Sequence, residues 1–475
     1  MKNYDVVIVG AGPVGLAIAV GLKACGIDNF MVLDQTTEFR RVGQVIDLLP
    51  NGLKALKSLD DCAYKAVKQS GLDFSQQTKN SQDQKNAKWV QRNFKGEEIQ
   101  SFPLSYDTWL AEYGEGRVSI PWYDLQTTLR QQLPPEQVQA NHRCVNLSKE
   151  TATGTIRLDF LSNTAKGINP YAHWSSPPEP SPGSESQPEA STSLRAKLVV
   201  AADGINSTIR RLLYQNTPYE ILGEPDYSGF AGIYCLQIED NLPDELKTEI
   251  QEKFLQQDRL VTVTTQKVNS IQDLRIVIFG VKNSWRYFIH LPIEQEKLAG
   301  KTSEDLVGLV LEALTQDDFP EAIKQLVTFS VRSQMKSRLF YIHRATLDDS
   351  LKFPDTTNLK PCLAQQLPWS RGRVVLVGDA AHGMPPFLAQ GANQGLEDAL
   401  VISTLIARLI NSNLLSEEEA IADIFHTYES LRRPLMEKVQ QATLDRTSYY
   451  QGEQLTTYQQ QVYNRDFHQL KASFV

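Results

Sequence analysis

Long apolar runs are missing from this sequence of 475 residues. No stretch reaches the roughly 20 consecutive apolar residues that a membrane-spanning helix needs. The first residues also lack the apolar segment and the small-residue cleavage site of a secretory signal. We therefore expect no integral membrane segment and a location in the cytoplasm.

Disulfide-forming and metal-ligating residues are scarce and scattered. The chain has 5 cysteines and 7 histidines, and it contains neither a C-x-x-C nor an H-E-x-x-H pattern. An odd number of isolated cysteines argues against a disulfide framework, and the spacings fit no zinc site. The sequence thus predicts reduced thiols and no bound metal.

Basic residues are outnumbered by acidic ones. Lys and Arg total 48 and Asp and Glu total 56, so the formal net charge is -8. This balance disfavours nucleic acid as a partner, because a phosphate-binding surface is usually basic. The length suffices for two or three domains with cores of their own.

The chain opens with the pattern of a strand, a glycine-rich turn, a helix and a second strand. The turn reads Gly10-Ala11-Gly12-Pro13-Val14-Gly15. Gly10 permits the tight turn, Gly12 lets the backbone approach a pyrophosphate, and Gly15 allows close packing of helix on strand. Asp34, at the end of the second strand, can accept hydrogen bonds from a ribose. The order of these features predicts a dinucleotide site, and the alternative is a glycine-rich turn without a ligand.

Two further strand patterns end in an aspartate. Residues 374–377 lead into Gly378-Asp379, and residues 198–202 lead into Asp203-Gly204. A carboxylate at the carboxyl end of a parallel strand lies where open α/β sheets bind ligands. Beyond Asp379, Gly391 opens a helix whose positive end can stabilise an anion. Taken alone, the Asp-Gly pair is more typical of a plain turn than of a ligand site.

In their order along the chain, these three motifs resemble those of the class A flavoprotein monooxygenases, the family of para-hydroxybenzoate hydroxylase. The segments 43–53 and 386–391 look most similar to the salicylate hydroxylase and zeaxanthin epoxidase branch. The resemblance implies FAD as the resident cofactor and NAD(P)H as a transient reductant. It also implies that O2 is used to hydroxylate or epoxidise a small aromatic or isoprenoid-type substrate, through a flavin C4a-hydroperoxide.

The resemblance assigns roles to residues of the motifs. Asp379 would bind the ribityl chain, Gly391 and its two successors would approach the flavin ring, and Asp203 and Gly204 would serve both FAD and the nicotinamide. The residues expected to bind the cofactor are Gly10, Gly12, Pro13, Val14, Gly15, Asp34, Arg41, Gln44, Asp203, Gly204, Asp379, Gly391, Ala392 and Asn393.

Two positions depart from the family pattern. Gln35 stands where many members have an arginine after the acid of the second strand. Trp122 stands where many have an arginine that contacts the flavin. Arg40, Arg41 and Arg117 are the candidates to replace that charge.

The fold class expected is α/β, with a Rossmann-like FAD-binding domain interleaved with a mostly antiparallel β-sheet substrate domain and followed by C-terminal helices. The FAD-binding domain is predicted over 1–72, 115–216 and 336–408, the substrate domain over 73–114 and 217–335, and the helical region over 409–475. A segment at 163–193, rich in Ser, Pro and Glu, is expected to be a mobile loop inserted in a strand pair. A linker between domains is the alternative.

The substrate pocket is expected between the flavin and the antiparallel sheet. The candidate lining residues are Phe230, Tyr234, Trp285, Tyr287, Phe387 and Leu388, although plain core packing is favoured for any single aromatic among them. His382 and Pro386 are the candidates for a catalytic role, although a structural role for His382 is favoured.

Other functions on the same fold are a flavin-dependent halogenase, a reductase of isoprenoid chains, and a non-catalytic flavoprotein that binds a partner. The W-x-W-x-I-P pattern of halogenases is not found in the sequence. The resemblance favours an enzyme whose partners are a small-molecule substrate and O2.

Overall fold

The computed structural model describes residues 2–41, 43–71, 87–162, 190–258, 260–264, 274–281, 284–346, 367–445 and 453–472. Of the loop predicted at 163–193, the residues 163–189 lie outside the described ones, and 190–193 belong to a strand. Cys362 also lies outside them. Within the described ranges, no helix is long and apolar enough to cross a membrane.

The first sheet has eight strands among the described residues and runs in the order β16-β17-β10-β1-β2-β7, with β9 on the first half of β10 and β8 on β9. Its strands are β1 (Asn3–Val9), β2 (Phe30–Leu33), β7 (Val138–Gln139), β8 (Arg143–Glu150), β9 (Thr155–Ser162), β10 (Ala190–Ala201), β16 (Ser370–Arg371) and β17 (Val374–Leu376). The strands β17, β10, β1 and β2 are parallel neighbours. Apolar runs without alternation form them because both faces of a parallel sheet are covered.

The parallel register brings three of the turns after these strands side by side. Val9 pairs with Ala201, and Ala201 pairs with Leu376. Backbone hydrogen bonds continue past the strand ends, from Ala202 N to Val9 O at 2.8 Å and from Val377 N to Ala201 O at 3.0 Å. The three sequence motifs therefore leave the sheet at one edge.

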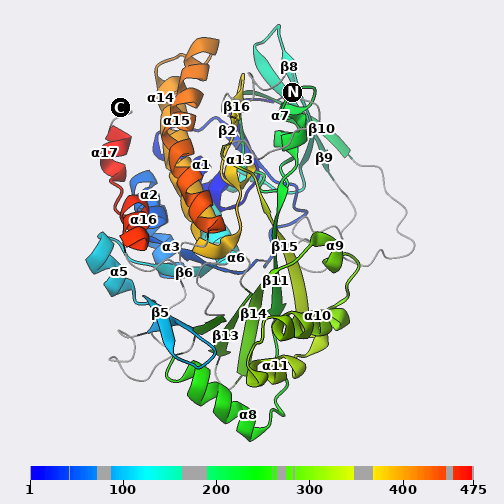
Figure 1. Ribbon diagram of the computed structural model, residues 1–475. Coiled ribbons are helices and arrows are strands. Elements are labelled where there is room, and N and C mark those ends of the chain that lie inside the picture. The colour runs from blue at the N-terminus through cyan, green and yellow to red at the C-terminus, as the bar shows by residue number, and fades with distance from the viewer. Residues whose placement is uncertain are drawn as a thin grey trace.

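Helices cover the first sheet (Figure 1). These are α1 (Pro13–Ala24), α2 (Pro50–Leu59), α14 (Gln390–Asn411) and α15 (Glu418–Leu444). The small residues of α1 allow α14 to approach closely, since a Cβ on Gly21 would lie 2.4 Å from Ser403 Oγ. Close packing at this contact leaves α14 little freedom to shift.

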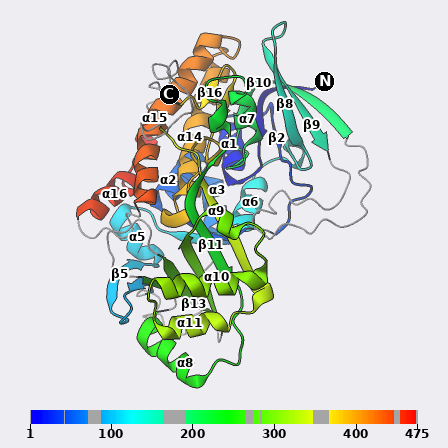
Figure 2. The same ribbon diagram turned by 45° about the vertical axis from the view of Figure 1, so that its right-hand side comes forward.

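The second sheet has seven strands in the order β15-β11-β14-β13-β12-β4-β5, all antiparallel neighbours except β12 and β4. They are β4 (Lys88–Arg92), β5 (Glu98–Pro103), β11 (Asp226–Cys235), β12 (Leu260–Thr264), β13 (Arg275–Val281), β14 (Ser284–Pro292) and β15 (Met335–Ile342). One face packs on α8 (Asp244–Glu249), α10 (Ser303–Gln316) and α11 (Glu321–Thr328) in a second apolar core (Figure 2). The mixed architecture agrees with the α/β fold class expected, although the division into domains at the residues given above remains a prediction.

The remaining elements join the two sheets and close the C-terminal side. They are the pair β3 (Val45–Leu48) and β6 (Val118–Pro121), the helices α3 (Asp61–Ser70), α5 (Tyr106–Tyr113), α6 (Trp122–Arg130), α7 (Thr208–Tyr214), α9 (Gln295–Leu298), α13 (Asp379–His382), α16 (Glu453–Tyr463) and α17 (Phe467–Ala472), and the short helical turn η6 (Pro386–Leu388). The C-terminal helices α16 and α17 lie beside α2 (Figure 1).

Candidate functional site

A cavity of about 2440 Å³ joins the carboxyl edge of the first sheet to one face of the second. Most of the residues predicted to bind the cofactor line it, namely Gly10, Gly12, Pro13, Val14, Asp34, Gln44, Asp203, Gly204, Asp379, Gly391 and Ala392. Its volume exceeds the 300–1,000 Å³ of an ordinary ligand pocket. Distant parts of the sequence therefore meet around a space that accommodates a dinucleotide.

The turn after β1 has the geometry of a phosphate-binding turn. Gly10 has φ +107°, and a Cβ there would lie 2.3 Å from Ala202 O. A Cβ on Gly15 would lie 2.0 Å from Gly10 O, so this residue packs α1 on the turn and does not line the cavity. A Cβ on Gly12 would meet nothing nearer than Trp122, at 3.8 Å. The start of α1 thus presents open backbone to the cavity, where its N–H groups can hold phosphate.

Asp34 connects the turn to the end of β2. Its Oδ2 accepts a hydrogen bond from Ala11 N at 2.6 Å, and its Oδ1 accepts one from Thr36 N at 2.8 Å. Burial raises the pKa of Asp34, and these two hydrogen bonds oppose the rise. The carboxylate reaches the cavity at the position expected for a ribose contact.

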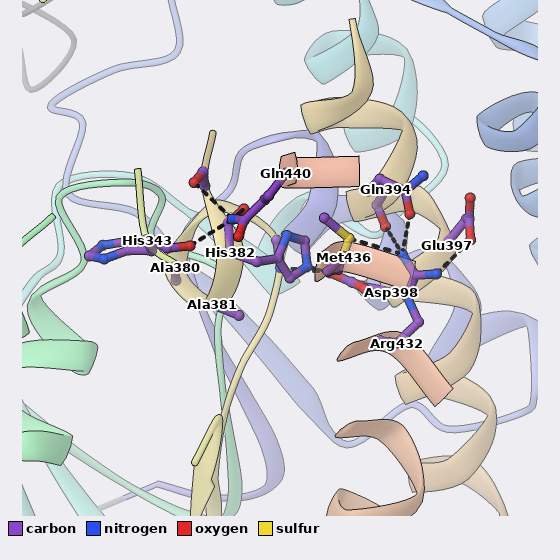
Figure 3. Close-up of polar contacts among 12 residues, drawn as sticks. His343, Ala380, Ala381, His382, Gln394, Glu397, Asp398, Arg432, Met436 and Gln440 are labelled. Atoms are coloured by element: carbon purple, nitrogen blue, oxygen red, sulfur yellow. Dashed lines mark hydrogen bonds and ion pairs between the residues drawn. The ribbon is translucent and has the colours of Figure 1, made fainter. Parts of the chain in front are cut away.

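Asp398 of α14 holds the turn that carries Asp379, and Figure 3 shows the contacts of Asp398 with His382 and Arg432. Asp398 Oδ2 accepts a hydrogen bond from Gly378 N at 2.9 Å and lies 2.6 Å from His382 Nε2. Its Oδ1 accepts one from Arg432 Nε of α15 at 2.7 Å. The side chain of His382 is therefore engaged in a buried contact and does not line the cavity, whereas Asp379 does.

The backbone of α13 is held by two more side chains. Arg210 Nη1 of α7 donates to Ala380 O at 2.9 Å and to Ala381 O at 3.1 Å. Gln440 Nε2 of α15 donates to His382 O at 3.0 Å (Figure 3). Sequence reasoning missed these residues, although Arg210 follows Asp203 in the Asp-Gly motif. The motif therefore supports the Asp379 turn as well as lining the cavity.

Asp203 organises the start of its own helix. Its Oδ1 accepts a hydrogen bond from Ser207 Oγ at 2.5 Å, and its Oδ2 accepts one from Ile209 N at 3.0 Å. Burial raises the pKa of Asp203, while these contacts oppose the rise. The pair Asp203-Gly204 is thus both a helix-capping turn and a part of the cavity wall.

The turn η6, which we call the wall, and the start of α14 form another side of the cavity. Pro386, Phe387 and Leu388 line it as η6, and the first turn of α14 follows with Gly391 and Ala392. A Cβ on Gly391 would lie 3.6 Å from Asp379 Oδ1. The N–H groups and partial positive charge of a 22-residue helix hence point at the place where Asp379 enters the cavity.

Asn393 lies behind this wall and does not line the cavity. Its Oδ1 accepts a hydrogen bond from Leu49 N at 2.8 Å, and its Nδ2 donates to Asp47 O at 2.9 Å and to Ala389 O at 2.6 Å. The side chain thus fixes the helix start to the β3 segment. These contacts indicate a positioning role for the side chain, and an approach of the Asn393 backbone to the flavin stays a prediction.

The position of the missing arginine is filled by Trp122 beside Gly12, and both line the cavity. Arg117 also lines it and pairs with Asp47 at 2.7 Å. Arg41, by contrast, has a side chain that is 83% exposed, lies 3.8 Å from Asp124 and does not line the cavity. Arg40 does not line the cavity either, so Arg117 is the arginine of the three candidates that reaches it.

Replacing Arg117 with glutamine is expected to weaken FAD binding by roughly tenfold or more, because a hydrogen bond to a charged group contributes about 1.5–3 kcal/mol. The matched change Arg41→Gln is expected to alter the Kd by less than about twofold, since exposed charges contribute little. Titration of apoprotein with FAD, followed by quenching of flavin fluorescence, measures both. Equal effects of the two changes would contradict this assignment.

The second sheet lines the cavity with alternate residues of β14. Arg286, Phe288 and His290 face the cavity. Tyr287 is 1% exposed and bonds Ser330 Oγ at 2.7 Å, and Trp285 packs against the second core. Because strand side chains alternate, Trp285 and Tyr287 lie on the opposite face of β14 from the three residues that line the cavity, as the core alternative predicted. We therefore reassign Trp285 and Tyr287 to the core side.

The other candidates for the pocket lie near the wall. Tyr234 of β11 lines the cavity, as do Phe387 and Leu388. Phe230 packs edge-on against Phe387 with ring centroids 5.3 Å apart. Among the described residues, no cluster of His, Cys, Asp and Glu could hold a metal ion.

Comparison with known proteins relates this arrangement to flavoproteins. A family described as "FAD binding domain" matches residues 356–443. The chain is 25% identical to a 3-amino-4-hydroxybenzoate 2-monooxygenase from Streptomyces cremeus, over 91% of this chain and 84% of that protein. It is 23% identical to a 6-hydroxynicotinate 3-monooxygenase from Bordetella bronchiseptica, over 93% and 91%. A salicylate hydroxylase from Pseudomonas putida is 37% identical over 19% of each chain.

Solved structures share the fold. A salicylate hydroxylase substrate complex superposes with a TM-score of 0.62 at 19% identity, over 100% of this chain and 98% of that one. HpxO of Klebsiella pneumoniae, solved with FAD and uric acid, superposes with a TM-score of 0.60 at 16% identity, over 100% and 95%. The fold of this chain is thus that of FAD-dependent monooxygenases.

Proposed function

We propose that this chain, an FAD-dependent monooxygenase, uses NAD(P)H and O2 to hydroxylate an aromatic substrate that carries a carboxylate or phenolate group. The observation that carries the proposal is a row of basic side chains on the second sheet, next to the wall that follows Asp379. We call Arg275, His290 and Arg338 the basic row.

The register of the sheet places the basic row. His290 pairs with Arg275 on one side and with Gly232 on the other, and Gly232 pairs with Arg338. All three basic residues line the cavity. The ring centroid of His290 lies 4.8 Å from that of Phe387, so the row adjoins the wall. An anionic group held here would keep an attached ring beside the start of α14.

Burial lowers the pKa of the Arg338 guanidinium, while Tyr234 and Asp379 oppose the change. An arginine with its ordinary pKa far above neutrality stays charged after such a change. A buried cation at the cavity wall favours an anionic substrate. The attraction between the two opposite charges offsets part of the free energy that is needed to remove each of them from water.

FAD fits the opposite side of the cavity. The backbone after Gly10 and the start of α1 would hold the pyrophosphate, Asp34 the ribose and Asp379 the ribityl chain. When bound, FAD supplies the electron transfer and oxygen activation for which the chain itself has no group. The first turn of α14 would stabilise negative charge on the ring. The wall of Pro386, Phe387 and Leu388 would exclude water from the reacting atoms.

The relatives named above are monooxygenases, which favours this function over a halogenase, an isoprenoid reductase or a non-catalytic flavoprotein. Two of them are named for a hydroxybenzoate and a hydroxynicotinate, and these names support an aromatic acid over an isoprenoid. The cytoplasmic location and the absence of a nucleic-acid partner remain predictions.

The test begins with the visible spectrum of the purified protein and the FAD that it retains. Oxidation of NADPH and of NADH is then followed with a panel of hydroxybenzoates and hydroxynicotinates. Substrate-stimulated oxidation with incorporation of oxygen from 18O2 is the expected result. A protein that takes up no added FAD, or whose products carry no labelled oxygen, would overturn the proposal.

Replacing Arg275 with glutamine is expected to raise the KM for a carboxylated substrate by about tenfold to a hundredfold, from the loss of a charged hydrogen bond. The KM for the matching neutral amide should change far less. Arg286→Gln, four residues along β14 from His290, is the control and should spare the selectivity. Steady-state kinetics with both compounds measures these KM values. An equal rise in KM for the acid and the amide would contradict a role of Arg275 in charge recognition.

A further inference from the structure

Beyond the basic row, the same face of the second sheet carries a row of apolar side chains that begins beside Arg286 of β14, the cross-strand partner of Phe279. Phe279 of β13 pairs with Leu260 of β12, Leu260 pairs with Trp89 of β4, and Trp89 pairs with Phe102 of β5. These four residues form one cross-strand row, and all four line the cavity. We call them the distal shelf.

The distal shelf is far from the basic row on the scale of a single ring. Arg275 and Phe279 are four residues apart on one strand, which spans about 13 Å at 3.3 Å per residue. Four adjacent strands carry the shelf, and at 4.8 Å between neighbours it is about 14 Å wide. Phe288 and Val277, a cross-strand pair, line the cavity between the two rows. A one-ring acid bound at the basic row would leave the shelf uncovered.

The shelf side chains are only partly buried, whereas residues of β12 and β4 that point to the opposite face are fully buried. Leu260, Trp89 and Phe279 keep part of their surface open, while Val261 and Val90 on the opposite face are 0% exposed. Trp89 Nε1 donates a hydrogen bond to Thr262 Oγ1 at 2.8 Å, which fixes the indole in place. Apolar surface held rigid inside a cavity is stabilised when a ligand covers it.

The volume agrees with a second large ligand. The cavity of about 2440 Å³ exceeds twice the upper end of the usual range for one ligand, about 1,000 Å³. The cavity therefore has room for FAD and for a substrate larger than a single ring.

We propose that the distal shelf binds the remote apolar part of the substrate. The substrate is then an aromatic acid or phenol with an extended hydrocarbon group, held by its anion at the basic row and by its hydrocarbon at the shelf. This inference rests on the proposed function, because it assigns the size of the substrate to the same cavity.

The experiment uses the FAD-loaded enzyme and a series of 2-hydroxybenzoates that carry methyl, butyl, hexyl or decyl chains. Perturbation of the flavin absorbance gives the Kd of each compound without NADPH and without turnover. Binding is expected to tighten along the series by up to about fourfold for each methylene that is buried. If the Kd for the unmodified enzyme does not depend on chain length, the inference that the distal shelf binds hydrocarbon is wrong, and no variant is needed to show this.

Phe279→Ala and Trp89→Ala test the location of the shelf. Each is expected to reduce the ratio of the methyl Kd to the decyl Kd by about tenfold or more, since the truncation removes apolar surface that the bound chain would cover. Ile221→Ala, at a side chain that is 59% exposed and away from the cavity, is the control and should keep the ratio. Equal ratios in the shelf variants and in the control would place the hydrocarbon elsewhere and overturn the inference.

The two proposals fail in different ways. If no member of the series takes up labelled oxygen, the proposed function fails, whatever the binding data show. If short and long compounds bind equally and are both hydroxylated, the proposed function stands and the distal shelf does not.

Discussion

Replacing Gly10 with alanine is expected to abolish the retention of FAD, with a Kd raised by at least about a thousandfold. The new Cβ would lie 2.3 Å from Ala202 O and 2.9 Å from Asp203 N, and both atoms belong to backbone held in the parallel sheet. The φ of +107° adds strain for any residue with a side chain. The turn can accommodate the methyl group only by moving the strand ends that shape the cofactor site.

Gly26→Ala is the matched control. Gly26 also has a positive φ, +81°, but a Cβ there would meet nothing within 4 Å. Only the backbone strain of about 1 kcal/mol remains at this position. The FAD bound per chain after gel filtration, read from the visible spectrum, compares the two variants. Full flavin content in Gly10→Ala would show that the turn does not contact the cofactor.

Replacing Arg432 with methionine is expected to lower the free energy of unfolding by about 3–5 kcal/mol, because it leaves buried charges without their partner. Arg432 bonds Glu397 at 2.6 Å and Asp398 at 2.7 Å, and both carboxylates are 0% exposed. Arg465 also pairs with Glu397, which leaves Asp398 as the more affected group. Urea unfolding of the FAD-free proteins measures the change.

The control for this change is Lys149→Met. Lys149 pairs with Glu418 at 3.5 Å, and both side chains are about half exposed. Such a pair contributes roughly 0–1 kcal/mol. A loss in Arg432→Met no larger than in Lys149→Met would mean that water or a rearranged side chain compensates the buried acids.

The buried acid also sets a pH dependence. Burial alone would raise the pKa of Asp398, but His382 and Arg432 bring it down to about 2, below the ordinary 3.8. A group with a lowered pKa stabilises the fold fully above its ordinary pKa. This contribution should therefore be complete above about pH 4 and disappear as the pH falls toward 2. Thermal unfolding between about pH 4 and pH 2 tests whether the stability falls as the pH is lowered.

The parts of the site that could be predicted from the sequence are those in which a residue's chemical type and its place next to a strand both indicate the same role. The tight turn at Gly10 requires a positive φ, and this can be recognised from the glycine pattern without knowing the fold. Asp34 and Asp379 each follow an apolar run that is typical of a parallel strand. Their meeting at one edge follows from the parallel order alone. Tyr287 shows the opposite case, because an aromatic residue on a strand can face either side and only the register decides.

Buried polar networks could not be predicted in this way. Asp398, Arg432 and Gln440 belong to long helices, where a charged or amide side chain ordinarily faces solvent. Their partners are distant in sequence, so spacing carries no signal of the contact. Asn393 likewise follows the motif that would place it near the ring, yet its side chain hydrogen-bonds the backbone of β3.

The contacts of α15 with the Asp379 turn bear on the biogenesis of the protein. Gln440 bonds the backbone of α13, and Arg432 acts on the same turn through Asp398, so the cavity that Gly10 lines also depends on residues late in the chain. During synthesis, the N-terminal strands leave the ribosome long before these helix residues. We therefore expect FAD to be loaded only after α15 has been made and has packed on the Asp379 turn.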